Sequence, residues 1–213
     1  MSFTRKINTA IVLAPHPDDG EFGCGATLNK LINQGTKVHY VAFSPCTISV
    51  PDGFDKDVLY RELNDACKQI GIPKENITTF DFPVRELSCH RQEILEALIK
   101  LRNSIQPDLV FLPSSSDIHQ DHETVHKEGV RAFKYTSILG YEMPWNNLNI
   151  TTNFHVNIDE ANLKAKWDAI NVYESQSGRS YKDFDFIKGL ARLRGTQINT
   201  KFAEAFELIR WII

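Results

Sequence analysis

The chain has 213 residues and a formal net charge of −3, and 42% of its residues are hydrophobic and 24% charged. This composition is typical of an ordinary globular protein, and the length suits one well-buried domain spanning residues 1–213. The sequence contains no basic run or stripe, which argues against nucleic acid or anionic lipid as a partner.

The sequence predicts a cytoplasmic protein without an integral membrane segment. The apolar run over residues 9–14 is shorter than the core of a signal peptide, which needs roughly 7–15 residues. No stretch approaches the roughly 20 apolar residues of a membrane span. The four cysteines are widely spaced and form no CxxC pair, which favours free thiols in a reducing compartment.

Strands and helices are predicted to alternate through the first two thirds of the chain. The helix over residues 57–70 shows the pattern most clearly, because its apolar residues recur at helical spacing. The run DLVFL is typical of a strand buried on both faces. The predicted strands cover residues 11–14, 37–43, 77–82 and 108–112, and the predicted helices cover 25–34, 57–70 and 91–105. This alternation predicts an α/β, Rossmann-like fold with a mostly parallel sheet and helices on both faces.

The pattern is less regular after residue 141. We expect a strand over residues 154–158 and helices over residues 160–173 and 184–194. The last segment has both helical and strand character, and we favour a strand over residues 206–212. No internal repeat or linker separates this region from the preceding one.

Metal-ligand residues follow the first predicted strand in the run HPDDGE, residues 16–21. In an open parallel sheet, ligands bind outside the carboxyl ends of the strands. Two adjacent carboxylates repel each other unless a cation neutralises them. His16 and Asp19 are spaced so that both can reach one metal, which leaves Asp18 pointing elsewhere, towards a water molecule. A helix cap is the alternative, but it explains only one of the two aspartates.

A second polar segment, residues 114–122, follows the strand over residues 108–112. Catalytic zinc sites use three protein ligands and keep the fourth position open. Because two histidines and a carboxylate are a common set, His119 and His122 are both candidates for the missing ligand. Asp121 lies between them and can orient an imidazole. The alternative is that these are solvated loop histidines.

The run HETVH, residues 122–126, also matches the H-E-x-x-H pattern of zinc proteases. In that interpretation His126 would be a ligand and Glu123 the base. The five-residue pattern is short, and it leaves the HPDD run unexplained. We therefore favour His126 as a packing residue one turn into a helix.

At these residues the chain resembles the LmbE/PIG-L family of zinc-dependent deacetylases. The first family motif is typically AHPDDE before a glycine-rich turn, and here it reads PHPDDGEFGCGATL. The second is typically HPDH, and here it reads HQDH. The resemblance covers most of the chain, including ARLRGTQINTKFAEAFELIR near the end, and it implies an LmbE-like fold. The acidic residue after the two aspartates is displaced by one place, which puts the usual structural role of Glu21 in question.

The resemblance implies a role for each motif residue in amide hydrolysis. Asp18 matches the general base that takes a proton from water. His119 matches the residue that assists the tetrahedral intermediate and the leaving amine, and Asp121 matches the residue that orients it. Either Asp18 or His119 then protonates the amine. The implied ligands of Zn²⁺, for which Fe²⁺ is the alternative ion, are His16, Asp19 and His122.

We expect the substrate pocket to draw on the loop over residues 44–55 and on aromatic and polar groups of the segment over residues 139–145. The resemblance is nearest to members associated with bacterial surface-polysaccharide synthesis. It implies a small N-acetylated amino sugar or sugar conjugate as substrate, and a homo-oligomer. The candidate substrate-binding residues are Arg61, Arg85, Tyr141 and Glu142.

Three rival functions remain open from the sequence. A zinc amidohydrolase acting on a non-sugar N-acyl compound would keep the same site. A zinc protease would require Glu123 and His126. A metal-binding protein without enzymatic activity would hold zinc but show no turnover.

Overall fold

The computed structural model of the protein describes residues 6–213, and all strands among them form one sheet. The sheet has seven strands in the order β3-β2-β1-β4-β5-β7-β6. The first five strands in that order are parallel to one another, and β7 runs antiparallel to both of its neighbours. The strand bounds are β1 Thr9–Ala14, β2 Lys37–Ala42, β3 Ile77–Thr79, β4 Leu109–Pro113, β5 Ser137–Tyr141, β6 Phe154–Ile158 and β7 Phe202–Arg210.

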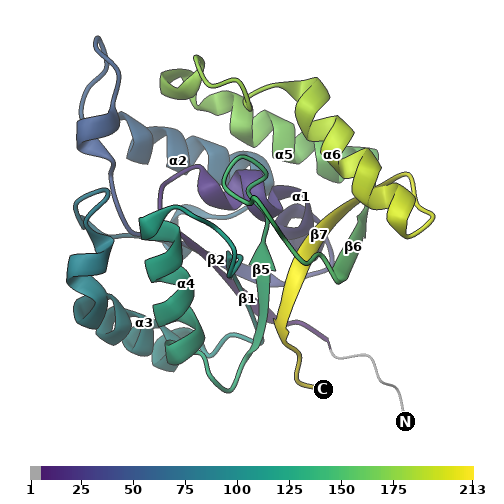
Figure 1. The fold of residues 1–213 in the computed structure, drawn as a ribbon, viewed down its shortest axis with the longest axis horizontal. Helices are drawn as coiled ribbons and strands as arrows, with labels where there is room; N and C mark the ends of the chain where they lie inside the picture. The colour runs from purple at the N-terminus through teal and green to yellow at the C-terminus, as the bar shows by residue number, and fades with distance from the viewer. Residues whose placement is uncertain (1–5) are drawn as a thin grey trace.

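Helices cover both faces of this sheet (Figure 1). Two of them, α3 and α4, pack together on one face, and the other four lie on the opposite face. Short 3₁₀ helices lie in the loops at Thr47–Ser49 (η1), Lys74–Asn76 (η2), Leu87–His90 (η3) and Glu174–Gln176 (η4). The helix bounds are α1 Asp19–Asn33, α2 Val58–Ile70, α3 Arg91–Ile105, α4 Gln120–Ala132, α5 Glu160–Val172 and α6 Phe184–Gln197.

The alternation of side chains along β1 divides the core into two layers. Val12 and its alternate neighbours join the cluster beneath α1, α2, α5 and α6, whereas Ile11 and Leu13 join the cluster beneath α3 and α4. Successive strand residues point to opposite faces, so a strand covered on both sides must be apolar throughout. This explains the unbroken apolar run of β1, whose residues 10–14 are fully buried.

The structure confirms the predicted α/β class with a mostly parallel sheet and helices on both faces. Several boundaries differ from the predicted ones. The first helix begins at Asp19 rather than at residue 25, β3 ends at Thr79 rather than at residue 82, and β7 begins at Phe202 rather than at residue 206. Within residues 6–213, no helix combines the length and apolar character needed to cross a membrane.

Candidate metal centre and catalytic cavity

The two polar motifs, which lie about a hundred residues apart in the sequence, meet at one edge of the sheet. β1 and β4 are parallel neighbours, so their carboxyl ends lie side by side. The turn after β1 carries His16 into the start of α1 at Asp19. The loop after β4 carries His119 to the start of α4, where His122 lies in the first turn.

Three side-chain atoms converge at this edge with the spacing of a metal site. Oδ2 of Asp19 lies 3.2 Å from Nδ1 of His16 and 3.2 Å from Nε2 of His122. The two imidazole nitrogens lie 3.4 Å apart. Tetrahedral zinc with ligands at about 2.0–2.1 Å requires ligand atoms about 3.3–3.4 Å apart. His16, Asp19 and His122 therefore fit one Zn²⁺ with little rearrangement.

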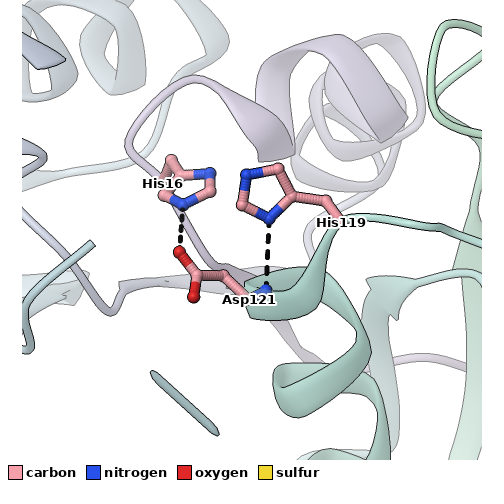
Figure 2. Close-up of side chains that lie close together, drawn as sticks. All are labelled: His16, His119 and Asp121. Carbon is pink, nitrogen blue, oxygen red and sulfur yellow. Dashed lines mark hydrogen bonds and ion pairs between the residues drawn. The ribbon is translucent and has the colours of Figure 1, made fainter. Parts of the chain in front are cut away.

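Each of the two histidines contacts a carboxylate through its other ring nitrogen. Nε2 of His16 lies 2.9 Å from Oδ2 of Asp121, and Nδ1 of His122 lies 2.7 Å from Oδ2 of Asp117. Figure 2 shows the first of these contacts. Such partners fix the tautomer that directs a lone pair towards the metal and raise the basicity of the ligand. The sequence motifs did not predict this role of Asp117.

The position of Asp121 corrects one expected role. Its carboxylate binds His16 and does not orient His119. The backbone N–H of Asp121 instead donates to Nδ1 of His119 at 3.2 Å, as Figure 2 shows. The reason is local, because Asp121 lies in the first turn of α4 and His119 is the residue that caps this helix.

Opposite charges stabilise one another strongly among the three ligands. Burial disfavours the protonated imidazole of His16, but Asp19 and the hydrogen bond to Asp121 outweigh burial and raise its pKa to about 9. Asp19 and Asp117 raise the pKa of His122 to about 10 in the same way, against the effect of burial. Burial would raise the pKa of Asp19, yet the two histidines hold it far below its usual value. A bound metal requires neutral imidazoles, so metal binding would release these protons.

Asp18 lies beside the three ligands and is not engaged by them. It occupies the N-cap position of α1, but its side chain makes no capping hydrogen bond. The cap interpretation of this residue is therefore wrong. Burial and the negative charge of Asp19 raise the pKa of Asp18 to about 6. A carboxylate of this kind is well matched to accepting a proton near neutral pH.

His119 faces the same cavity as a neutral imidazole. Burial and the neighbouring charges of His16 and His122 lower its pKa. The backbone N–H of Asp121 occupies Nδ1 as a donor, so the ring proton must lie on Nε2. His119 can therefore donate a hydrogen bond from Nε2.

Glu21, whose displaced position raised the question of its role, is a buried support for the turn. It is fully buried, and its carboxyl oxygens lie 2.5 Å from the hydroxyl of Tyr40 and 2.9 Å from that of Tyr173. Both hydroxyls also lie within hydrogen-bond distance of the carbonyl of Pro17. Burial raises the pKa of Glu21 to about 8. The network ties α1 and the turn before it to β2 and to the end of α5.

A cavity of about 310 Å³ opens over the three ligands and Asp18. Its volume lies at the small end of the range for ligand pockets, roughly 300–1,000 Å³. Cys46 and Ser49 line it, as expected for the loop over residues 44–55. Arg85 also lines it, which agrees with its predicted place near the substrate.

Three of the four candidate substrate-binding residues lie outside this cavity, which contradicts their predicted role. Arg61 is exposed on α2 and forms ion pairs with Asp55 and Asp57. Tyr141 is fully buried, and its hydroxyl donates to the carbonyl of Leu13 at 3.0 Å.

Glu142 is buried too and accepts two hydrogen bonds from Arg194, at 2.9 and 2.6 Å. Tyr141 is the last residue of β5, and Glu142 follows it directly. Packing against α1 and α6 turns both side chains away from the cavity. A Cβ at Gly23 of α1, for example, would lie 2.3 Å from the ring of Tyr141.

The sequence did not reveal the part of the cavity wall that follows α5. Gln176, Arg179 and Tyr181 come from this segment. Tyr181 stacks on Trp145, with ring centroids 3.9 Å apart and an angle of 10° between the ring planes. Trp145 ends the aromatic segment that was expected near the substrate. This part of the wall could have been suspected from the run YESQSGRSY, which is polar and lies between two predicted helices.

The HETVH run does not form a zinc protease site. His126 directs Nδ1 to the carbonyl of Pro113 at 2.8 Å and does not line the cavity. Glu123 is exposed and pairs with Lys127. Only His122 of this run takes part in the metal centre.

The chain is similar to known proteins in sequence and in fold. Residues 11–133, which include both metal-ligand motifs, match the family described as PIG-L: GlcNAc-PI de-N-acetylase. The uncharacterized deacetylase YaiS of Escherichia coli K12 is 26% identical over 185 residues, which cover 82% of this chain and 95% of YaiS.

Two solved structures share the fold. The N,N'-diacetylchitobiose deacetylase of Pyrococcus horikoshii has a TM-score of 0.80 and 21% identity, over 95% of this chain and 84% of that chain. GalB, the 4-carboxy-2-hydroxymuconate hydratase of Pseudomonas putida, has a TM-score of 0.76 and 16% identity, over 97% of this chain and 98% of that chain. Since a deacetylase and a hydratase share this fold, the fold alone does not specify the reaction.

Proposed function

The chain belongs to the PIG-L family of de-N-acetylases, and from this we propose that it is a zinc-dependent N-deacetylase. The substrate in this proposal is a small N-acetylated amino sugar or sugar conjugate. The observation that carries it is the convergence of His16, Asp19 and His122 at 3.2–3.4 Å, with Asp18 unpaired beside them. The substrate class rests on the family description and on the diacetylchitobiose deacetylase that shares the fold.

The donor set suits Zn²⁺, with Fe²⁺ as the alternative ion, because two imidazoles and a carboxylate are common ligands of both. When bound, the metal lowers the pKa of water and polarises the acyl carbonyl. The carboxylates of Asp117 and Asp121 hold the two imidazoles in the tautomers that such binding needs. The remaining chemistry belongs to the two residues that face the cavity, Asp18 and His119.

Asp18 acts as the general base on the attacking water. It lines the cavity, and its side chain makes no capping hydrogen bond to α1. Having accepted the proton, Asp18 is positioned to return it to the nitrogen of the leaving amine. We assign this second transfer to Asp18 rather than to His119, because Nδ1 of His119 accepts a hydrogen bond and the ring carries a single proton.

His119 stabilises the oxyanion of the tetrahedral intermediate. Its Nε2–H is the donor left free for this purpose, and the backbone N–H of Asp121 holds the ring in place. A fixed donor directed at developing negative charge costs no reorganisation during the reaction. The neutral ring also adds no positive charge beside the metal centre.

Acetate release tests the proposal directly. The zinc-loaded protein is incubated with N-acetylglucosamine, N,N'-diacetylchitobiose and N-acetyl amino acids, and free acetate is measured. We expect release from the sugars and little from the amino acids. Release from the amino acids alone would favour the non-sugar amidohydrolase. Hydration of an unsaturated carboxylate, with no acetate released from any N-acetyl compound, would favour a reaction like that of the hydratase and contradict the proposal.

Asp18→Asn is the matching variant. We expect it to retain zinc, because Asp18 is not one of the three ligands. We expect its rate of acetate release to fall about 10²–10⁴-fold, as is usual when an acid–base group is removed. Metal content and acetate release are measured on the same preparation. Full activity in Asp18→Asn would exclude its role as base.

We also propose a cytoplasmic location, from the cysteine spacing and the short apolar run near residue 9, and a homo-oligomeric assembly, from the resemblance to the family. Light scattering on the purified protein tests the assembly. A monomer at micromolar concentration would contradict it.

A further inference from the structure

Two arginines line the catalytic cavity without an acidic partner. Arg85 lies in the loop after β3, and Arg179 lies in the segment after η4. Among residues 6–213, no carboxylate lies within ion-pair distance of either guanidinium, although four other arginines of the chain each pair with a carboxylate. Those four are Arg61, Arg91, Arg131 and Arg194. The two cavity arginines are therefore available to a ligand.

The fold holds Arg85 at the cavity in a costly backbone conformation. Its φ of 68° lies in the left-handed region, which a residue with a long side chain rarely adopts. The carboxylate of Asp121 accepts its backbone N–H at 2.7 Å, and the side chain of Gln120 donates to its carbonyl at 3.3 Å. Both backbone groups are thus occupied, while the guanidinium makes no hydrogen bond to residues 6–213. Backbone strain of this kind is concentrated at ligand sites.

Arg179 is positioned by an aromatic stack. Its Nε donates to Oε1 of Gln176 at 3.2 Å, and neither terminal nitrogen makes a hydrogen bond within the described residues 6–213. Two residues further on, Tyr181 stacks on Trp145, and the ring of Phe22 packs edge-on against both. These rings fix the segment that carries Arg179 to the wall of the same cavity.

The lining of the cavity has two acidic residues, Asp18 and Asp19, and neither forms an ion pair with an arginine. The carboxylates of Asp117 and Asp121 lie behind the two histidine ligands and contact them instead. The two guanidinium groups therefore face a concave surface without an ion-pair partner among residues 6–213, and such a surface strengthens their attraction for anions. The guanidinium group presents N–H donors in a fork that matches the oxygens of phosphate and carboxylate groups.

We infer that the substrate carries an anionic group, a phosphate or a carboxylate, which Arg85 and Arg179 bind while the acetyl group lies at the metal centre. This inference rests on the proposed deacetylation, and it narrows the substrate to an acidic N-acetyl amino sugar. The cavity of about 310 Å³ has room for little more than one such unit.

Steady-state kinetics on matched neutral and anionic substrates test the inference. The substrates are N-acetylglucosamine, N-acetylglucosamine 6-phosphate, N-acetylglucosamine 1-phosphate and N-acetylmuramic acid. We expect the wild-type protein to show a KM about 10–100-fold lower for an anionic substrate than for the neutral sugar, as charge-assisted hydrogen bonds would give. The comparison between the phosphates and the carboxylate identifies which anion the site takes.

Arg179→Gln and Arg85→Gln should raise the KM for the anionic substrate towards that for the neutral sugar, with a kcat that changes much less. Arg179→Lys should restore part of the preference, because it keeps the charge. Arg61→Gln is the matched control, since this arginine is exposed and outside the cavity. It should leave the preference unchanged. Thermal melting shows whether each variant is folded.

Equal KM values for neutral and anionic sugars in the wild-type protein would overturn the inference and leave the deacetylase proposal intact. A preference that survives in both glutamine variants would overturn it as well. If no compound releases acetate, the proposed function fails, and calorimetric binding decides the anion site separately. Glucosamine 6-phosphate should then bind more tightly than glucosamine in the wild-type protein and not in Arg179→Gln, and equal binding would overturn the site.

Discussion

Each histidine ligand of the metal centre depends on a carboxylate that does not itself reach the metal. Asp121 accepts from His16 at 2.9 Å, and Asp117 accepts from His122 at 2.7 Å. We predict that Asp117→Asn and Asp121→Asn each lower zinc affinity by about 10–100-fold, because the amide no longer fixes the imidazole tautomer. Competition with a chromogenic chelator measures this affinity.

The control for this prediction is Asp65→Asn, an exposed aspartate on α2 far along the chain from both motifs. It should bind zinc as the wild-type protein does. If the Asp117 and Asp121 variants also retain full affinity, the two carboxylates do not support the metal ligands.

The single proton of the His119 ring leads to a prediction about the variants of this residue. The Nε2–H donor should matter more than a positive charge, since Nδ1 is occupied by the N–H of Asp121. A glutamine amide can replace that donor but cannot become a cation. We predict that His119→Gln retains at least about tenfold more activity than His119→Ala, since one oxyanion donor is worth about 10²–10³ in kcat. Equal activity of the two variants would show that the imidazolium is needed.

At the scale of the element, α1 is interrupted one turn after the metal-binding turn. Cys24 has a non-helical φ of −148°, so backbone groups on both sides lose their partners within the helix. Lys166 of α5 donates to the carbonyl of Phe22 at 2.6 Å, and Glu204 of β7 pairs with Lys166 at 2.6 Å. Glu204 also accepts the first backbone N–H groups after the interruption, those of Ala26 and Thr27.

This buried ion pair therefore joins the two halves of α1, and the first half carries Asp19. We predict that Lys166→Met destabilises the protein by about 3–5 kcal/mol, because it leaves the charge of Glu204 buried without its partner. Urea unfolding followed by circular dichroism measures the change. Lys164→Met is the control on the same helix, where an exposed pair with Asp168 should contribute no more than about 1 kcal/mol. Equal destabilisation by the two substitutions would show that the buried pair of Lys166 and Glu204 does not hold the two halves of α1 together.

At the scale of the whole molecule, the sheet and the metal centre follow from local sequence patterns. Alternating apolar runs and amphipathic helices indicate the parallel sheet, and parallel strands bring their carboxyl ends to one edge. The position of the two polar motifs after two such strands indicated that they converge, whereas the choice of His122 over His119 as the ligand came from the family resemblance. The first helix was predicted to begin too late because its first turn is rich in acidic residues and glycine, which hides its helical periodicity.

The substrate side of the cavity could not be predicted in the same way. Its walls come from separate loops, and whether a loop side chain faces the cavity depends on packing elsewhere. Glu142 turns inward because Arg194 of α6 binds it, whereas Arg179 reaches the cavity because aromatic rings fix its segment. The spacing of apolar residues along the sequence does not predict such contacts between loops and distant elements. The carboxylate of Asp121 was expected to contact His119 and contacts His16 instead. This contact also depends on tertiary packing that the sequence pattern does not show.

We propose above all that His16, Asp19 and His122 hold one metal ion at the neighbouring carboxyl ends of β1 and β4. Zinc content of His122→Ala and His126→Ala tests it most directly, because both histidines lie on α4 and only one lies at the centre. After loading with one equivalent of zinc and gel filtration, His126→Ala should retain about one ion per chain, as the wild-type protein does, and His122→Ala should retain almost none. Loss of zinc from His126→Ala together with its retention in His122→Ala would contradict the account.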